Sequence, residues 1–249
     1  MPRIVSFLFF VSFFWDQNLC AQAPIRIPYE CTPQDVDAFG LNCSDEEPCQ
    51  VFLELTAAES IGGRLMMVGN LHTRTVTMFS LLLASDDGGS TWAEPTPRIH
   101  NAALDLIQFF DGQNGWASGE SIDPLARNAF MLVTNDGGRI WRQRPLFDDT
   151  KYGTIAQFHF TSPSAGELVL DASQGKATRQ ERYETQTGGE SWELKEKGTA
   201  RLRLNNTHVS DLHLAADAKA GTYKLERGTG KAAQPIASFV IHTADCKGF

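Results

Sequence analysis

Three copies of one eight-residue pattern hold the side chains of this sequence that could do chemistry. They are SDDGGSTW at 85–92, TNDGGRIW at 134–141 and TQTGGESW at 185–192, with starts 49 and 51 residues apart. Asp87 and Asp136 could act as catalytic acids or nucleophiles, and the DDGG loop could hold calcium. A glycosidase, however, needs two carboxylates that face one sugar. Calcium loops use alternating oxygen ligands over a longer stretch that ends in Glu.

A structural role explains every position of the pattern. Adjacent glycines allow the positive φ that a reversing chain requires, and a carboxylate can accept several amide bonds inside the turn. In the third copy Thr187 replaces the acid while both glycines and Trp192 remain, which a turn tolerates better than a reaction does. We therefore expect each copy to form a tight structural turn, called a corner below, with no catalytic residue and no metal site. Their residues are Ser85, Asp87, Gly89, Thr91, Trp92, Thr134, Asp136, Gly138, Trp141, Thr185, Gly189, Ser191 and Trp192.

The corners recur within a repeat of about fifty residues, which is typical of repeat architectures. After residue 49 the chain consists of short β-like runs separated by Gly, Asp and Asn, and ARLRLN at 200–205 is one of them. This pattern predicts an all-β propeller of about four and at most five four-stranded blades. The expected domain covers 50–249, with units at 50–100, 101–151, 152–197 and 198–249, the last without a corner. A short helix capped by Thr32 is expected within 32–40.

The N-terminus has the layout of a secretory signal peptide over 1–21, followed by a Cys-rich segment at 22–49. Leu19 before Cys20 is too bulky for a lipoprotein site, so we expect no lipid anchor. We expect an exported protein, periplasmic or extracellular, without membrane insertion after cleavage. Cys31, Cys43, Cys49 and Cys246 then form two disulfides, at least one of them long-range, with the connectivity left open.

The corner pattern resembles the Asp-box of bacterial neuraminidase repeats. With the preceding strand NGWASG at 114–119, it is similar to the photosystem II stability/assembly factor-like family of β-propellers. The resemblance covers roughly residues 50–197. It implies boxes on the hairpins between third and fourth strands, away from the central binding face. It also implies a non-catalytic binding or assembly module with a protein partner and no cofactor.

The alternative is a carbohydrate-binding protein or a diverged sialidase-like glycoside hydrolase. The IRIP at 25–28 is similar to the sialidase motif whose arginine binds the substrate carboxylate, here Arg26. Tyr183 and Glu184 are adjacent on one predicted strand, so they point to opposite faces and cannot act as a pair. Trp116 is expected in the core rather than as a sugar platform.

Overall charge limits the partners further. The 249 residues carry a formal net charge of −8 without a basic cluster to offset it. Nucleic acids and anionic membrane surfaces require a basic face. We therefore expect no nucleic-acid partner.

Overall fold

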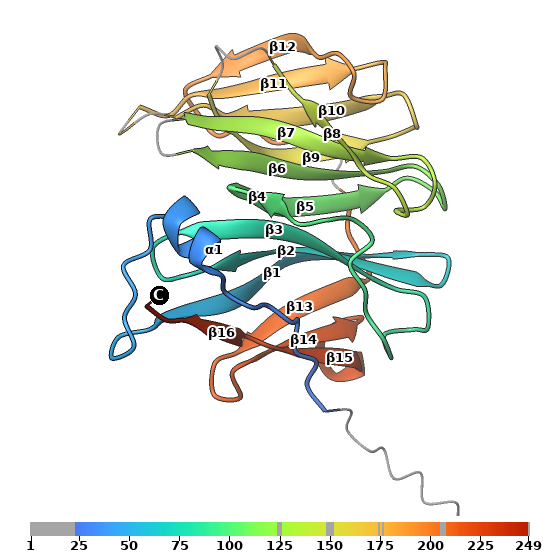
Figure 1. Ribbon diagram of the computed structural model, residues 1–249. Helices are drawn as coiled ribbons and strands as arrows, with labels where there is room; N and C mark the ends of the chain where they lie inside the picture. The colour runs from blue at the N-terminus through green and yellow to red at the C-terminus, as the bar shows by residue number, and fades with distance from the viewer. Residues whose placement is uncertain are drawn as a thin grey trace, which may run out of the picture.

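A computed structural model shows an all-β fold in which the described residues form four antiparallel sheets (Figure 1). The structure describes residues 23–248 apart from 124–125, 148–151, 174, 176 and 205–207. The sheets have three to five strands each. They follow one another as the blades of a propeller, which confirms the expected fold class. The predicted leader at 1–21 lies outside the described residues.

Blade 1 combines early and late parts of the chain. It contains β1 (Cys49–Ile61), β2 (Arg64–His72), β3 (Thr77–Ser85), β4 (Ile99–His100) and β16 (His242–Cys246). Their order in the sheet is β16-β1-β2-β3-β4. β2 and β3 are buried along almost their whole length, because this blade has neighbours on both faces. Their continuous apolar runs are typical of fully buried strands.

Blades 2 and 3 are four-stranded meanders. Blade 2 contains β5 (Ala102–Phe109), β6 (Gly115–Asp123), β7 (Ala126–Thr134) and β8 (Arg142–Pro145). Blade 3 contains β9 (Thr154–Phe160), β10 (Gly166–Asp171), β11 (Gln180–Thr185) and β12 (Glu193–Gly198). In both blades the strands pair in chain order. Each corner therefore joins the third strand of a blade to its fourth.

Blade 4 draws on both ends of the described chain. It contains β13 (Leu212–Asp217), β14 (Thr222–Arg227) and β15 (Gln234–Val240), with a short 3-10 turn η1 (Gly230–Ala232) before β15. Ile25 extends its edge: the Ile25 N–H donates to Ser238 O and its carbonyl accepts from Val240 N, both at 2.8 Å. After Ile241 the chain leaves this sheet, and β16 joins blade 1 instead.

The blades are stacked in the spatial order 4-1-2-3, from bottom to top of Figure 1. The first strands β13, β1, β5 and β9 contact one another in that order, as inner strands do around a propeller axis. Three hydrophobic clusters fill the spaces between neighbouring blades. In the cluster between blades 2 and 3, Trp116 stacks on Phe160 with ring centroids 3.7 Å apart. Trp116 is 1% exposed, so its expected place in the core is confirmed.

Two buried amide side chains connect the blades. Asn70 of β2 accepts from Leu104 N at 2.9 Å and donates to Leu104 O at 3.3 Å. Gln108 of β5 accepts from Phe160 N at 2.8 Å and donates to Phe160 O at 3.0 Å. Each amide thereby satisfies both backbone groups of one residue on the first strand of the next blade. Such pairing is required because buried backbone groups without partners are costly.

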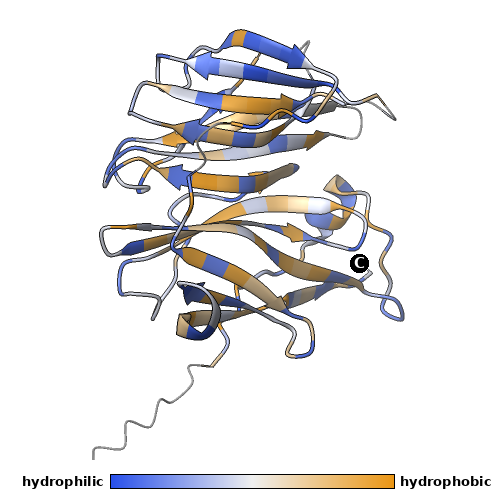
Figure 2. Cartoon of the chain, turned by 180° about the vertical axis from the view of Figure 1, so that it is seen from behind, coloured by the Kyte–Doolittle hydropathy of each residue, from blue (hydrophilic) through white to orange (hydrophobic). Residues whose placement is uncertain are grey.

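The outward face of blade 3 is polar. Arg182 lies at its centre, 2.9 Å from Glu184, 3.4 Å from Glu196 and 3.8 Å from Glu167. The outermost strands at this end are largely hydrophilic (Figure 2). A polar outer face on a terminal unit is what keeps repeat proteins soluble. This face lies at one end of the stack that the described residues form.

Residues 201–204, which we expected to form a strand, instead cross this face without strand structure. The Leu202 N–H donates to the Gln180 side chain at 2.7 Å, and the Leu204 N–H donates to Gln157 at 3.2 Å. Because these backbone N–H groups donate to side chains, they do not form the backbone hydrogen bonds of a strand ladder. The expected strand was wrong for that reason.

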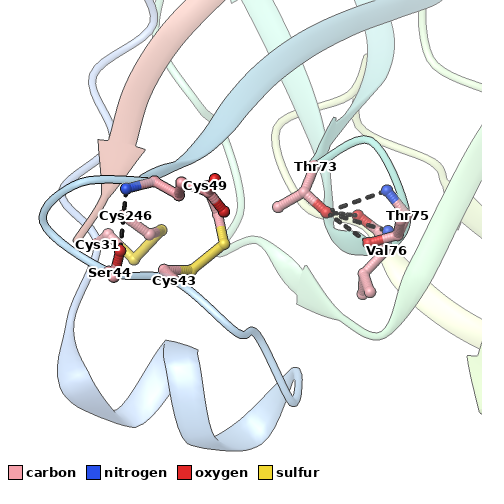
Figure 3. Close-up of a disulfide and its surroundings, with 9 residues drawn as sticks. Cys31, Cys43, Ser44, Cys49, Thr73, Thr75, Val76 and Cys246 are labelled. Atoms are coloured by element: carbon pink, nitrogen blue, oxygen red, sulfur yellow. Dashed lines mark hydrogen bonds between the residues drawn. A yellow bond between two sulfur atoms is a disulfide. The ribbon is translucent and has the colours of Figure 1, made fainter. Parts of the chain in front are cut away.

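The described part of the N-terminal segment carries helix α1 and takes part in both disulfides. α1 (Pro33–Ala38) begins after Thr32, whose hydroxyl accepts from Asp35 N in a capping box, so the expected cap is confirmed. The long-range bridge expected from the cysteine positions joins Cys31 to Cys246, and a second joins Cys43 to Cys49 (Figure 3). No helix among the described residues has the length and apolarity to cross a membrane.

Candidate functional site

The first corner is held by hydrogen bonds between its own residues. Ser85 Oγ donates to Asp87 Oδ1 and accepts from Gly89 N, both at 2.8 Å. Asp87 accepts from Thr91 N at 2.9 Å and from Thr91 Oγ1 at 2.7 Å. The Trp92 indole donates to Gly89 O at 3.0 Å. The Thr91 bonds, aided by Ser85, lower the pKa of Asp87 to about 2, so the carboxylate stays ionised and is unsuited to act as a general acid.

The second corner repeats this network and the third adapts it. Asp136 accepts from Thr134 Oγ1 at 2.8 Å and from Ile140 N at 3.0 Å. In the third corner the Thr187 hydroxyl accepts from Ser191 N at 2.9 Å and so replaces the carboxylate. These geometries support the structural role that the sequence suggested for the corners.

Each corner also packs against the blade before it in space. A Cβ placed on Gly89 would meet Ile236 of blade 4, and one on Gly138 would meet Met66 of blade 1. The indole of Trp92 lies 5.3 Å from the Phe239 ring of blade 4. The corners are therefore contacts between blades.

The residues of the sialidase alternative are not assembled into a site. Arg26 donates to the carbonyls of His242 and Thr243, so it holds the N-terminal segment on β16. Tyr183 is 1% exposed, and its hydroxyl donates to the carboxylate of Glu181 rather than Glu184. Burial acts to raise the pKa of Glu181, but bonds from Tyr183 and Arg179 outweigh it and lower that pKa to about 2. A carboxylate held in this way stabilises the blade.

A groove of about 180 Å³ lies between the second and third corners. Its polar lining offers two arginines, Arg142 and Arg144, and two amides, Asn114 and Asn135. Arg144 is bound to Glu190 at 2.9 Å, while Ile140 on the rim is 61% exposed. The remaining lining residues are Trp116, Val133, Thr134, Asp136, Pro163, Thr187 and Gly188.

The chemistry of this groove fits a peptide segment. The exposed Asn135 amide can pair with a peptide backbone, whereas the Asn114 amide already donates to Asp111. Arginines bind carboxylates, and exposed Ile140 can contact an apolar side chain. Sequence reasoning missed Arg142 and Arg144. Their alternation after the second corner was the available signal, because residues two apart on a strand share a face.

A second polar cluster lies beside the inner strands. His208 is bound to the buried carboxylate of Glu59. This bond raises the pKa of His208 against the opposing effect of burial. His159, 3.4 Å from Gln108 Nε2, has its pKa lowered by burial and by the charge of His208. The cluster links the chain before β13 to blade 1, and no group of three or more acidic, His or Cys side chains suited to a metal occurs among the described residues.

Comparison with known proteins gives one match in sequence and several in structure. No family model matches the chain. Over 145 residues it is 29% identical to the photosystem II assembly lipoprotein Ycf48 of Synechococcus sp. (strain CC9902), covering 52% of this chain and 37% of that protein. This similarity confirms the expected resemblance to the photosystem II assembly-factor group.

The similar solved structures include YCF48 bound to a D1 peptide, at 20% identity and a TM-score of 0.43, covering 78% of this chain and 56% of that one. They also include an ulvan lyase of polysaccharide lyase family PL25 bound to a sugar, at 10% identity and a TM-score of 0.44, covering 80% and 54%. The chain spans little more than half of these solved proteins and less than half of the curated relative.

Proposed function

We propose that this chain is an exported, non-catalytic binding module that holds a peptide segment of a protein partner in the groove between its second and third corners. The observation that carries the proposal is the sequence similarity to a photosystem II assembly lipoprotein. A protein of that name, YCF48, has been seen with a D1 peptide. Two disulfides, which persist in oxidising compartments, support export to the periplasm or the extracellular space.

The groove supports a peptide better than a sugar. Sugars stack on exposed aromatic faces, but the Trp116 side chain at the groove is 1% exposed and its indole donates to Gly188 O at 3.1 Å. The corner carboxylate Asp136 is occupied by Thr134 and Ile140. Arg142, together with Arg144 in exchange for its exposed partner Glu190, is suited to a ligand that carries a carboxylate.

Fluorescence anisotropy with a labelled D1 peptide tests the proposal. We expect saturable binding that weakens about tenfold or more in the double variant Arg142→Ala/Arg144→Ala, because a charged hydrogen bond contributes about 1.5–3 kcal/mol. Arg203→Ala is the matched control, since Arg203 is exposed and lies outside the groove. Peptide binding that both variants leave unchanged would exclude the groove.

A glycan array run beside the peptide assay separates the two classes of ligand. Specific glycan binding without peptide binding would favour the carbohydrate alternative. Release of sialic acid that Arg26→Ala abolishes would establish a hydrolase and overturn the non-catalytic proposal. We expect neither result, because Arg26 is committed to backbone carbonyls.

A further inference from the structure

The four described cysteines lie together where β1 and β16 close blade 1 (Figure 3). All of them belong to or pack against the same hydrophobic cluster. In the β1–β16 ladder Cys49 lies directly opposite Cys246. Neither is bonded to the other: Cys49 is bonded to Cys43, and Cys246 to Cys31.

The register makes a bond between Cys49 and Cys246 geometrically accessible. Directly opposed residues of antiparallel strands have Cα atoms about 4.5–5.5 Å apart and side chains on one face. Disulfides accept Cα separations of about 4.4–6.8 Å. The two sulfurs could therefore be joined without moving either strand.

The sulfurs of the two existing bridges differ in access, because Cys31, Cys43 and Cys49 are partly exposed whereas Cys246 is buried. Cys43 and Cys49 are half-exposed at the ends of a loop whose residues 45–47 are exposed. Cys246 is 0% exposed. A thiol from solvent can reach both cysteines of the short bridge but only Cys31 of the long one. The buried sulfur of Cys246 is instead within reach of Cys49, its direct neighbour on the adjacent strand.

We propose that these cysteines form a disulfide relay that releases the N-terminal segment when the Cys43–Cys49 bridge is reduced. An external dithiol reductant, such as a thiol oxidoreductase, first reduces the Cys43–Cys49 bond and is itself oxidised to a disulfide. The Cys49 thiolate then attacks the Sγ of Cys246. The Cys49–Cys246 bond forms, the Cys31–Cys246 bond breaks, and Cys31 leaves as a thiolate that takes up a proton. This second step is an exchange without net oxidation.

The relay moves one cross-link from the N-terminal segment to the joint between β1 and β16. Blade 1 stays covalently closed after the exchange. The N-terminal segment through α1 is then held only by non-covalent contacts, chiefly the buried Ile27, the buried Phe39 at the end of α1 and the Arg26 hydrogen bonds. The free Cys31 thiol becomes available for a mixed disulfide.

Two single variants of the full chain test the relay. Cys43→Ser leaves Cys49 as the free thiol, and the matched Cys49→Ser leaves Cys43. Both are incubated at about pH 8.5, near the ordinary pKa of a thiol, then alkylated and mapped by non-reducing peptide analysis. We expect Cys49 linked to Cys246 with Cys31 alkylated as the major species in Cys43→Ser. In Cys49→Ser we expect the Cys31–Cys246 bond to persist.

The unaltered chain provides a third arm that does not depend on the folding of a variant. Limiting dithiothreitol should yield alkylated Cys43 and Cys31 together with a Cys49–Cys246 link. An intact Cys31–Cys246 bond in all three arms would overturn the relay. So would release of Cys31 without a Cys49–Cys246 link, or equal exchange in both variants. None of these results depends on peptide binding.

Discussion

Replacement of Gln108 by leucine should expose how strongly the blades depend on buried amides. Gln108 is 3% exposed, and its side chain pairs with both the N–H and the C=O of Phe160. Leucine fills a similar volume but leaves both backbone groups buried without a partner. At about 1–3 kcal/mol for each unsatisfied group, Gln108→Leu should lower the free energy of unfolding by about 2–6 kcal/mol.

Urea denaturation followed by tryptophan fluorescence measures this loss of stability, because Trp116 stacks on Phe160, the residue that Gln108 binds. Gln113→Leu is the matched control: Gln113 is exposed in the same blade, and surface changes usually fall within about 0.5 kcal/mol. The reasoning fails if Gln108→Leu costs no more than the control. A change in the m-value alone would indicate an altered compactness of the folded or unfolded state instead of the loss of the Gln108 hydrogen bonds.

Two further perturbations address the third corner and the pair formed by His208 and Glu59. Thr187→Asp gives the third corner the carboxylate that the other two have and should raise the free energy of unfolding by about 0.5–1.5 kcal/mol. Thr187→Val removes the hydroxyl and should lower it. A loss of stability in Thr187→Asp would contradict the corner geometry. The pKa of His208 is raised by Glu59, so its contribution to stability is complete below the unfolded pKa of about 6.5. That contribution is lost as pH rises through the folded pKa. Denaturation experiments between about pH 6 and pH 9 should show this decline in the free energy of unfolding, and Glu59→Gln should make it smaller. An equal dependence on pH in the unaltered chain and in Glu59→Gln would exclude the His208–Glu59 pair as the cause.

Local features of the fold were visible in the sequence because they depend on neighbouring residues. The corner hydrogen bonds join residues at most four apart, such as Ser85 and Gly89, and the helix cap joins Thr32 and Asp35. Residue types at fixed spacing therefore predicted both. The expectation of four or five blades followed from the repeat period and the length of chain after residue 49.

The features that escaped prediction depend on partners distant in sequence. His208 and Glu59 are separated by 149 residues, and nothing in either neighbourhood indicates the other. The alternation at 201–204 is typical of a strand, yet Gln157 and Gln180 bind its amides. For the groove, strand periodicity could have placed Arg142 and Arg144 on one face, but only the packing of blade 2 on blade 3 shows what they line.

The placement of β16 in blade 1 affects the order in which the protein can mature. A chain made from its N-terminus presents β1 to β4 long before residues 242–246 exist. Until then one edge of β1 has no partner, and such an edge can pair with another chain. Blades 2 and 3 can be completed as they emerge, whereas the first sheet begun is the last to be finished.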